Sequence, residues 1–194
     1  MGLAALNLRY NPFGELDRDD RGRVAVVDVE PLVTALRVPG TAVQLRGACG
    51  RGKSTHLHAI ASALPEARYS RVDRGGPRCS GGIYLMDEAD HFGPVRRWAY
   101  LRRASSLAVA THADMSRFLR LCGYRVVDVA VGGVRRERLV ALCDKRIEAA
   151  RAGEGALPRV PEALLAELEA RHGDDLRAIE DALYDWVQDL AASA

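Results

Sequence analysis

The chain has 194 residues, of which 48% are hydrophobic and 28% are charged, and its formal net charge is +2. No run of about 18 uninterrupted apolar residues occurs, so we expect no membrane span, and the small net charge does not by itself argue for nucleic-acid binding. The four cysteines are widely spaced and form no Cys-x-x-Cys pair, which disfavours a zinc site or a disulfide framework and is typical of a cytoplasmic protein.

Near the N-terminus the pattern is polar and rich in turns, centred on Asn11-Pro12-Phe13-Gly14. Val24 to Val27 is either a short strand or buried coil, and Asp28 could cap a short helix with Pro31 in its first turn. Strands and helices then alternate. The expected strands are 41–46, 67–72, 83–86, 106–110 and 124–131, and the expected helices between them are about 52–64, 94–104 and 115–122.

This alternation predicts an α/β fold with a parallel five-stranded sheet and helices on both faces. After Gly132-Gly133 the pattern indicates helices only, at 135–152, 161–172 and 175–190. We therefore expect an α/β core with an N-terminal extension over residues 1–133, followed by a small all-helical lid over residues 134–194.

A phosphate-binding motif lies between the first expected strand and its following helix. The run from Gly47 to Ser54 matches G-x-x-x-x-G-K-[ST], a P-loop, whose backbone N–H groups and helix N-terminus attract phosphates. Only two of the 28 basic residues are lysine, and one of them occupies the motif position that requires it. The residues expected to bind the nucleotide are Gly47, Ala48, Cys49, Gly50, Arg51, Gly52, Lys53, Ser54 and Thr55.

Two carboxylates follow the apolar strand at 83–86, as in a Walker B motif. Asp87 would hold Mg²⁺ together with the Ser54 hydroxyl, and Glu88 would orient the attacking water. Asp90 is close enough to be a rival, but a solvated turn residue is the better interpretation. Lys53 would contact the β- and γ-phosphates.

The next strand ends at Thr111-His112, beside the expected carboxylates. Thr111 could hydrogen-bond the attacking water or a phosphate oxygen, and its alternative role is to cap the strand end. His112 receives no role, because a lone histidine is more often a structural hydrogen-bonding group.

Together these motifs resemble the AAA+ family of ATPases, over roughly residues 40–190. The resemblance implies a P-loop ATPase fold, ATP and Mg²⁺ as cofactors, and an arginine facing the nucleotide from the lid. Arg177 in Gly173-Asp174-Asp175-Leu176-Arg177 fits that place, and Arg146 is a weaker candidate. Asn11-Pro12-Phe13 is similar to a motif near the adenine pocket of transposition-helper and secretion ATPases, although Phe13 could simply be part of the core.

The resemblance also implies a homo-oligomer in which a neighbour's arginine completes the site, with Arg117 or Arg120 as candidates. Other partners are a protein and DNA. Two arginine groups could contact phosphates or form solvated helix faces; they are Arg96, Arg97, Arg102 and Arg103, and Arg135, Arg136 and Arg138. The loop from Asp73 to Gly82 has no aromatic pore-loop signature, which argues against a protein-threading motor.

The main functional hypothesis is an ATPase whose nucleotide cycle switches assembly or partner binding, with a DNA transaction as one setting. The alternative is a nucleotide-dependent binding module with little intrinsic hydrolysis. A P-loop kinase fits less well, because the helical C-terminal third and the Asp-Glu pair are typical of an ATPase. No Asn-Lys-x-Asp pattern is present to favour guanine.

Overall fold

The computed structural model describes residues 2–16, 20, 22, 24–72, 79–91, 93–132 and 136–193, apart from the side chains of Pro94 and Arg96. The chain divides into two compact units. One, here called the α/β unit, comprises residues 21–131, and the other, the helical unit, comprises residues 1–20 and 132–194. Residues 73–78, most of the loop expected from Asp73 to Gly82, lie outside the described part, as does Arg135.

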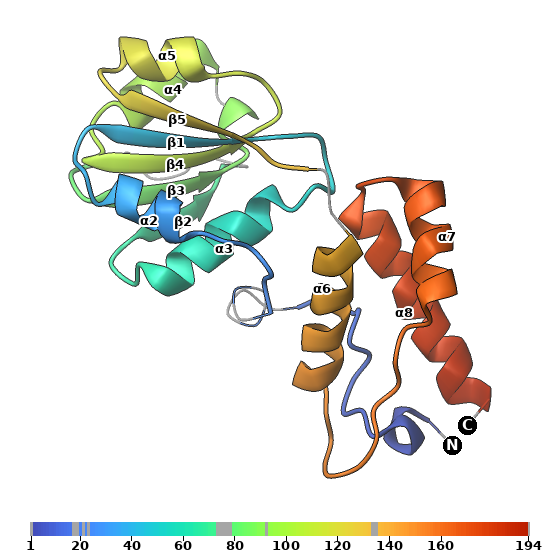
Figure 1. Ribbon diagram of the computed structural model, residues 1–194. Coiled ribbons are helices and arrows are strands. Elements are labelled where there is room, and N and C mark those ends of the chain that lie inside the picture. The colour runs from blue at the N-terminus through green and yellow to red at the C-terminus, as the bar shows by residue number, and fades with distance from the viewer. Residues whose placement is uncertain are drawn as a thin grey trace. The chain divides into compact units, whose positions relative to one another are not determined.

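The α/β unit is built on a five-stranded parallel sheet with the strand order β2-β3-β4-β1-β5 (Figure 1). The central strands are almost fully buried, as expected for a parallel sheet covered on both faces. The strands are β1 (Thr41–Arg46), β2 (Arg68–Arg71), β3 (Ile83–Asp87), β4 (Ser106–Thr111) and β5 (Arg125–Ala130). Both the fold class and this five-stranded parallel sheet confirm the prediction.

Helices cover both faces of this sheet (Figure 1). On one face, α2 (Glu30–Leu36) and α3 (Lys53–Ala63) pack with Val43 and Leu45 of β1. On the other face, α4 (Pro94–Leu101) and α5 (Ser116–Leu121) pack with Ala42 of β1. The alternation of side chains along β1 therefore assigns one core to each face.

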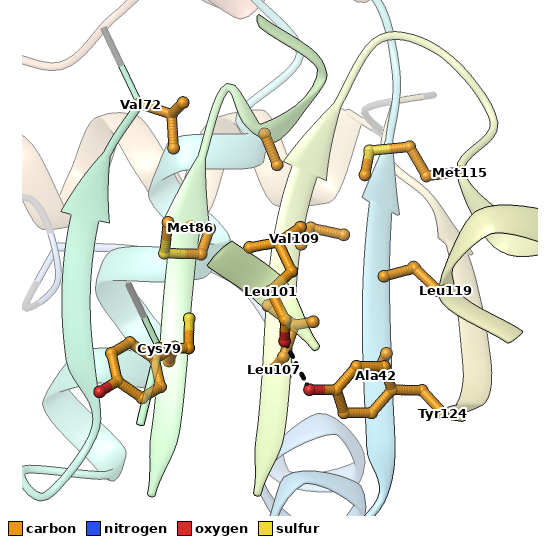
Figure 2. Close-up of a cluster of buried hydrophobic side chains, with 12 residues drawn as sticks. Ala42, Val72, Cys79, Met86, Leu101, Leu107, Val109, Met115, Leu119 and Tyr124 are labelled. Carbon is orange, nitrogen blue, oxygen red and sulfur yellow. Dashed lines mark hydrogen bonds between the residues drawn. The ribbon is translucent and has the colours of Figure 1, made fainter. Parts of the chain in front are cut away.

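The second of these cores contains the buried phenol of Tyr124, whose O–H group has two backbone carbonyl oxygens as acceptors. The Tyr124 hydroxyl contacts the carbonyl oxygens of Leu101 at 2.7 Å and Ala104 at 2.9 Å, so it joins the end of α4 to the start of β5 (Figure 2). The segment from Val24 to Val27, which we expected as a strand or as buried coil, has no regular structure.

The helical unit contains α6 (Arg136–Ala149), α7 (Glu162–His172), α8 (Leu176–Ser193) and the short 3₁₀ helix η1 (Leu3–Leu6). Their apolar faces share one core, to which Leu139, Leu165 and Leu183 contribute from the three α-helices. Each of the three α-helices begins and ends within a few residues of the expected bounds, whereas η1 was not expected.

The N-terminal segment belongs to this helical unit, which corrects our assignment of it to the α/β core. The Phe13 ring is 5% exposed and lies in the helical core. The Arg146 guanidinium donates to the carbonyl oxygens of Pro12 and Gly14, both at 2.7 Å, and also pairs with Glu180. Arg146 is therefore buried as a structural clamp on the N-terminal segment.

All four cysteines are free. Within the described ranges, no helix has the length and apolar character needed to cross a membrane.

Candidate nucleotide site

The P-loop runs from the end of β1 into α3. Gly50 and Gly52 adopt the left-handed conformation, with φ of 77° and 85°, which a glycine adopts without steric cost. At Gly47 a Cβ atom would lie 2.3 Å from the carbonyl oxygen of Val131. The motif glycines are therefore required by backbone geometry, and the loop enters α3 at its N-terminus, where N–H groups favour phosphate.

Lys53, the first residue of α3, is 8% exposed. Its Nζ donates to the carbonyl oxygens of Gly47 and Ala48, both at 2.8 Å, so the ammonium lies against the loop backbone. Burial lowers its pKa, and the nearby Cys49, Asp87, Asp90 and Glu88 oppose that shift. The Lys53 ammonium is therefore close enough to the carboxylates at the end of β3 to interact with them electrostatically.

Asp87 is the last residue of β3 and is 4% exposed. The Tyr69 hydroxyl, from the neighbouring strand β2, donates to Asp87 Oδ2 at 3.0 Å. The Tyr69 ring stacks on the ring of His58 from α3, with centroids 4.6 Å apart. This contact holds the carboxylate from one side, and among the described residues no hydrogen bond occupies its other oxygen, which can ligate a cation.

The residues of this site fit a magnesium ion bound together with a nucleotide. Mg²⁺ prefers a few protein oxygen ligands and completes its shell with phosphates and water. The buried Asp87 carboxylate and the Ser54 hydroxyl, one residue beyond Lys53, are suitable donors. Among the described residues no group of three His, Cys, Asp or Glu side chains is placed to hold a metal alone.

Glu88 follows the strand in an unusual conformation, with a φ of 58°. Such left-handed backbone is uncommon for residues other than glycine and occurs often at functional sites. Its carboxylate accepts two hydrogen bonds from Arg71 of β2, at 2.8 Å and 3.3 Å, and His91 Nδ1 lies 3.5 Å from Oε2. The predicted water-orienting group is therefore engaged by a neighbouring arginine.

Asp90 differs from our expectation of a solvated turn residue, because its side chain is 14% exposed. Its Oδ2 accepts the backbone N–H of His112 at 2.9 Å, so it ties the turn after β3 to the end of β4. Burial favours a higher pKa for this carboxyl, but that hydrogen bond and others leave the pKa below its ordinary value.

Thr111 is fully buried at the end of β4. Its hydroxyl donates to the carbonyl of Ala113 at 2.8 Å and accepts the Ala113 N–H at 3.2 Å, which is the strand-capping geometry we considered as its alternative role. The Thr111 carbonyl also accepts the N–H of Gly47 at 3.3 Å, so this residue helps to position the start of the P-loop.

Three residues near the site were not anticipated from the sequence: Tyr69, Arg71 and His58. The available signal was strand register, because β2 pairs in parallel with β3 and Arg71 is the partner of Asp87. A residue at the end of a strand next to Walker B lies beside the carboxylates, but the sheet order is needed to see it.

Three of the predicted arginines lie at exposed positions, whereas Arg146 is buried in the helical unit. Arg117 and Arg120 are exposed on α5 of the α/β unit, and Arg177 is exposed in the first turn of α8 in the helical unit. Their roles toward a nucleotide stay predictions.

Comparison with solved structures places this fold among known proteins. Domain III of the replication initiation protein DnaA from Thermotoga maritima matches with a TM-score of 0.55 and 16% identity, over 88% of each chain. A DNA replication initiation factor matches with a TM-score of 0.53 and 14% identity, over 87% of this chain and 61% of that one. AMPPCP-bound DnaA from Aquifex aeolicus matches with a TM-score of 0.50 and 14% identity, over 90% and 64%.

These likenesses show the fold, which agrees with the AAA+ architecture expected from the motifs. No protein-family model and no curated protein sequence matches the chain. The transposition-helper or secretion type remains a prediction.

Proposed function

We propose that this chain binds ATP with Mg²⁺ and hydrolyses it as an AAA+-like protein. The observation that carries the proposal is the buried Lys53 ammonium, held on the P-loop backbone near Asp87 and Glu88. A buried lysine on a phosphate-binding loop, close to carboxylates that follow the adjacent strand, is the arrangement that nucleotide hydrolysis requires. The AMPPCP held by the Aquifex aeolicus neighbour supports an adenine nucleotide.

Each residue has a role in this proposal. The backbone N–H groups of the loop and the Lys53 ammonium bind the phosphates, while the Ser54 hydroxyl and Asp87 hold the metal. When bound, Mg²⁺ supplies charge neutralisation to the phosphate oxygens. Glu88 orients the attacking water once its carboxylate leaves Arg71, and Tyr69 keeps Asp87 in position.

A second candidate is a nucleotide-dependent binding module with little intrinsic hydrolysis. The observation that favours it is the engagement of both Glu88 carboxylate oxygens by Arg71. While that pair is closed, Glu88 is occupied by a cation rather than by water. ATP occupancy would then set the conformation, and turnover would require a partner that opens the pair.

Turnover measurements separate the two candidates. Purified protein at high concentration is assayed for Mg²⁺-dependent phosphate release, beside Glu88→Gln and Lys53→Ala. The ATPase proposal expects wild-type turnover that both variants abolish. Wild-type turnover equal to that of Glu88→Gln, with ATP binding intact, would support the binding module instead.

The nucleotide cycle would switch self-assembly or the binding of a protein partner, in a DNA transaction suggested by the replication initiation proteins of similar fold. Arg117 or Arg120 would complete the site of a neighbouring copy. Measuring the mass with and without MgATP tests assembly. Arg117→Ala and Arg120→Ala then identify the arginine that completes the neighbour's site, because only the loss of that arginine reduces turnover in the assembled state. A monomer under both conditions would contradict this part of the proposal.

A further inference from the structure

The charges of the α/β unit are unevenly distributed along the chain. Residues 93–127 contain seven arginines and a single acidic residue, Asp114, although the whole chain has 28 basic and 26 acidic residues. The Asp114 carboxylate accepts hydrogen bonds from the Ser116 N–H and from Gln44, and it offsets only one of the seven positive charges. This stretch includes α4 and α5, which cover the same face of the sheet.

Several arginines in this stretch form no ion pair, unlike many other arginines of the molecule. Arg71, Arg146 and Arg171, for example, each pair with a glutamate. By contrast, four exposed arginines have no ion-pair partner among the described residues: Arg102, Arg103, Arg117 and Arg120. Unpaired guanidinium groups of one sign on one face favour an anionic partner.

Large apolar side chains are exposed among these cations. Val95 and Trp98 of α4 are 83% and 46% exposed, and Leu121 of α5 is 76% exposed. The Arg102 guanidinium lies over the Trp98 ring, 4.0 Å from its centroid, which is a cation–π contact. Exposed aromatic groups beside arginines are the elements with which proteins bind the bases and phosphates of single strands.

The two helices lie next to each other on the same face of the sheet. The Arg97 guanidinium of α4 lies 5.5 Å from the centroid of the Phe118 ring of α5, and both helices pack into the same core (Figure 2). Arg102 also lies close enough to Cys122, which follows Leu121, to oppose the effect of burial on the pKa of that thiol. The Arg102 guanidinium is therefore within electrostatic range of the end of α5.

We propose that this surface, here called the α4/α5 surface, binds single-stranded nucleic acid. It comprises Val95, Trp98, Arg102, Arg103, Arg120 and Leu121. The arginines would neutralise phosphates, and a base would stack on the Trp98–Arg102 pair. A duplex offers no unstacked base, so the exposed indole favours a single strand over a duplex.

A second copy of the chain is the competing occupant, since α8 carries exposed acidic residues at Asp181, Asp185 and Asp189. A purely electrostatic contact of that kind gives no role to an exposed Trp98 stacked with a guanidinium. The observations therefore favour nucleic acid, and the experiment below includes the other occupant as an outcome.

The test uses the full chain and a fluorescent 20-nucleotide oligothymidylate, without ATP, so that it is independent of the proposed ATPase. Anisotropy is measured over a salt titration for the wild type, Trp98→Ala and the double variant Arg102→Ala, Arg103→Ala. Trp98→Ala should weaken binding about tenfold, as expected for the loss of one stacked base. The double variant should also reduce the slope of log Kobs against log salt by about 1.4, for two lost phosphate contacts on a single strand.

The matched control removes two exposed arginines elsewhere, Arg37→Ala and Arg159→Ala, and should leave both affinity and slope nearly unchanged. In a Trp186→Phe background Trp98 is the sole tryptophan, and its fluorescence should be quenched by the oligonucleotide. Circular dichroism melting confirms that each variant is folded.

Three results would overturn the proposal. The first is that the protein binds a 20-base-pair duplex as tightly as the single strand and that Trp98→Ala binds as tightly as the wild type. That result would show that charge attraction alone accounts for binding. The second is no binding to either oligonucleotide at low salt. The third is self-association that is lost both in the double arginine variant and in a triple variant with Asp181→Asn, Asp185→Asn and Asp189→Asn. In that case neither variant would change oligonucleotide binding.

Discussion

Arg71 holds Glu88 through two hydrogen bonds, from Nη2 to Oε1 at 2.8 Å and from Nε to Oε2 at 3.3 Å. The arginine side chain is 60% exposed and the glutamate side chain 26% exposed, so water competes with the pair. Ion pairs of this exposure contribute about 0.2–1 kcal/mol. The pair therefore favours this conformation of the Glu88 side chain but does not fix it.

Arg71→Ala should therefore raise basal ATP turnover, by up to about fivefold, because that free energy no longer opposes the release of Glu88. The affinity for MgATP should change little, since Arg71 does not contact the P-loop in the described structure. Steady-state phosphate release and titration calorimetry measure the two quantities. Arg68→Ala is the matched control, because Arg68 lies on the same strand and donates to the Tyr84 hydroxyl instead. A fall in turnover to the level of Glu88→Gln would show that Arg71 itself acts in the site.

Tyr69→Phe should raise the Mg²⁺ concentration needed for half-maximal ATP binding by about tenfold. The variant removes only the hydroxyl that holds Asp87 Oδ2, and losing a hydrogen bond that orients a metal ligand commonly costs 10–100-fold in metal affinity, about tenfold at the low end. Calorimetry at fixed ATP and varied Mg²⁺ measures the shift. Tyr10→Phe, which removes a hydroxyl bonded to the Ala149 carbonyl, serves as the control. An unchanged Mg²⁺ requirement would contradict the role given to Asp87.

Arg146→Ala should destabilise the helical unit by about 3 kcal/mol. The substitution leaves the carbonyls of Pro12 and Gly14 without their donor and Glu180 without its partner, and breaking a buried ion pair costs about 3–5 kcal/mol. We choose the lower end because Glu180 is 29% exposed. Urea unfolding followed by Trp186 fluorescence in a Trp98→Phe background measures the loss.

Arg171→Ala is the control for that experiment, because its exposed pair with Glu167 should contribute less than about 1 kcal/mol. Equal losses in the two variants would mean that Arg146 does not clamp the N-terminal segment.

The α/β unit should lose stability in acid through Asp128. Hydrogen bonds from Gln44 and Arg46 keep the pKa of Asp128 below its ordinary value of 3.8. A carboxyl whose pKa is lower in the folded state gives a stabilisation that is complete above about 3.8 and is lost as the pH falls further. Between about pH 5 and pH 3, the thermal midpoint of Asp128→Asn should therefore fall less than the midpoint of the wild type.

Thermal unfolding followed by Trp98 fluorescence in a Trp186→Phe background measures that dependence. Asp189→Asn, an exposed carboxylate of the helical unit, should leave it unchanged. A wild-type midpoint that is level across this range would contradict the prediction.

Much of the fold could be predicted from local patterns. The strand expected at 41–46 has those bounds in the structure, and the helix expected at about 52–64 begins at Lys53, because glycine and proline mark their ends. The P-loop glycines also follow from local rules, since their left-handed backbone is a property of single residues.

Pairings between distant segments could not be predicted in this way. The contact of Arg71 with Glu88 depends on β2 lying next to β3, and the contact of Tyr69 with Asp87 depends on the same neighbour relationship. Phe13 was expected either near a nucleotide or in a core. Its burial among α6, α7 and α8 follows from long-range packing, which one sequence does not reveal.

The central claim is that Lys53 serves a nucleotide site, and binding of MgATP to Lys53→Ala tests it most directly. Titration calorimetry compares the wild type, Lys53→Ala and Lys145→Ala, the last removing the other lysine of the chain, which is exposed on α6. We expect wild type and Lys145→Ala to bind one MgATP with similar affinity, and Lys53→Ala to bind at least about tenfold more weakly, as for the loss of a hydrogen bond from a charged group. Equal affinity in all three proteins, or binding lost equally in both variants, would contradict the account.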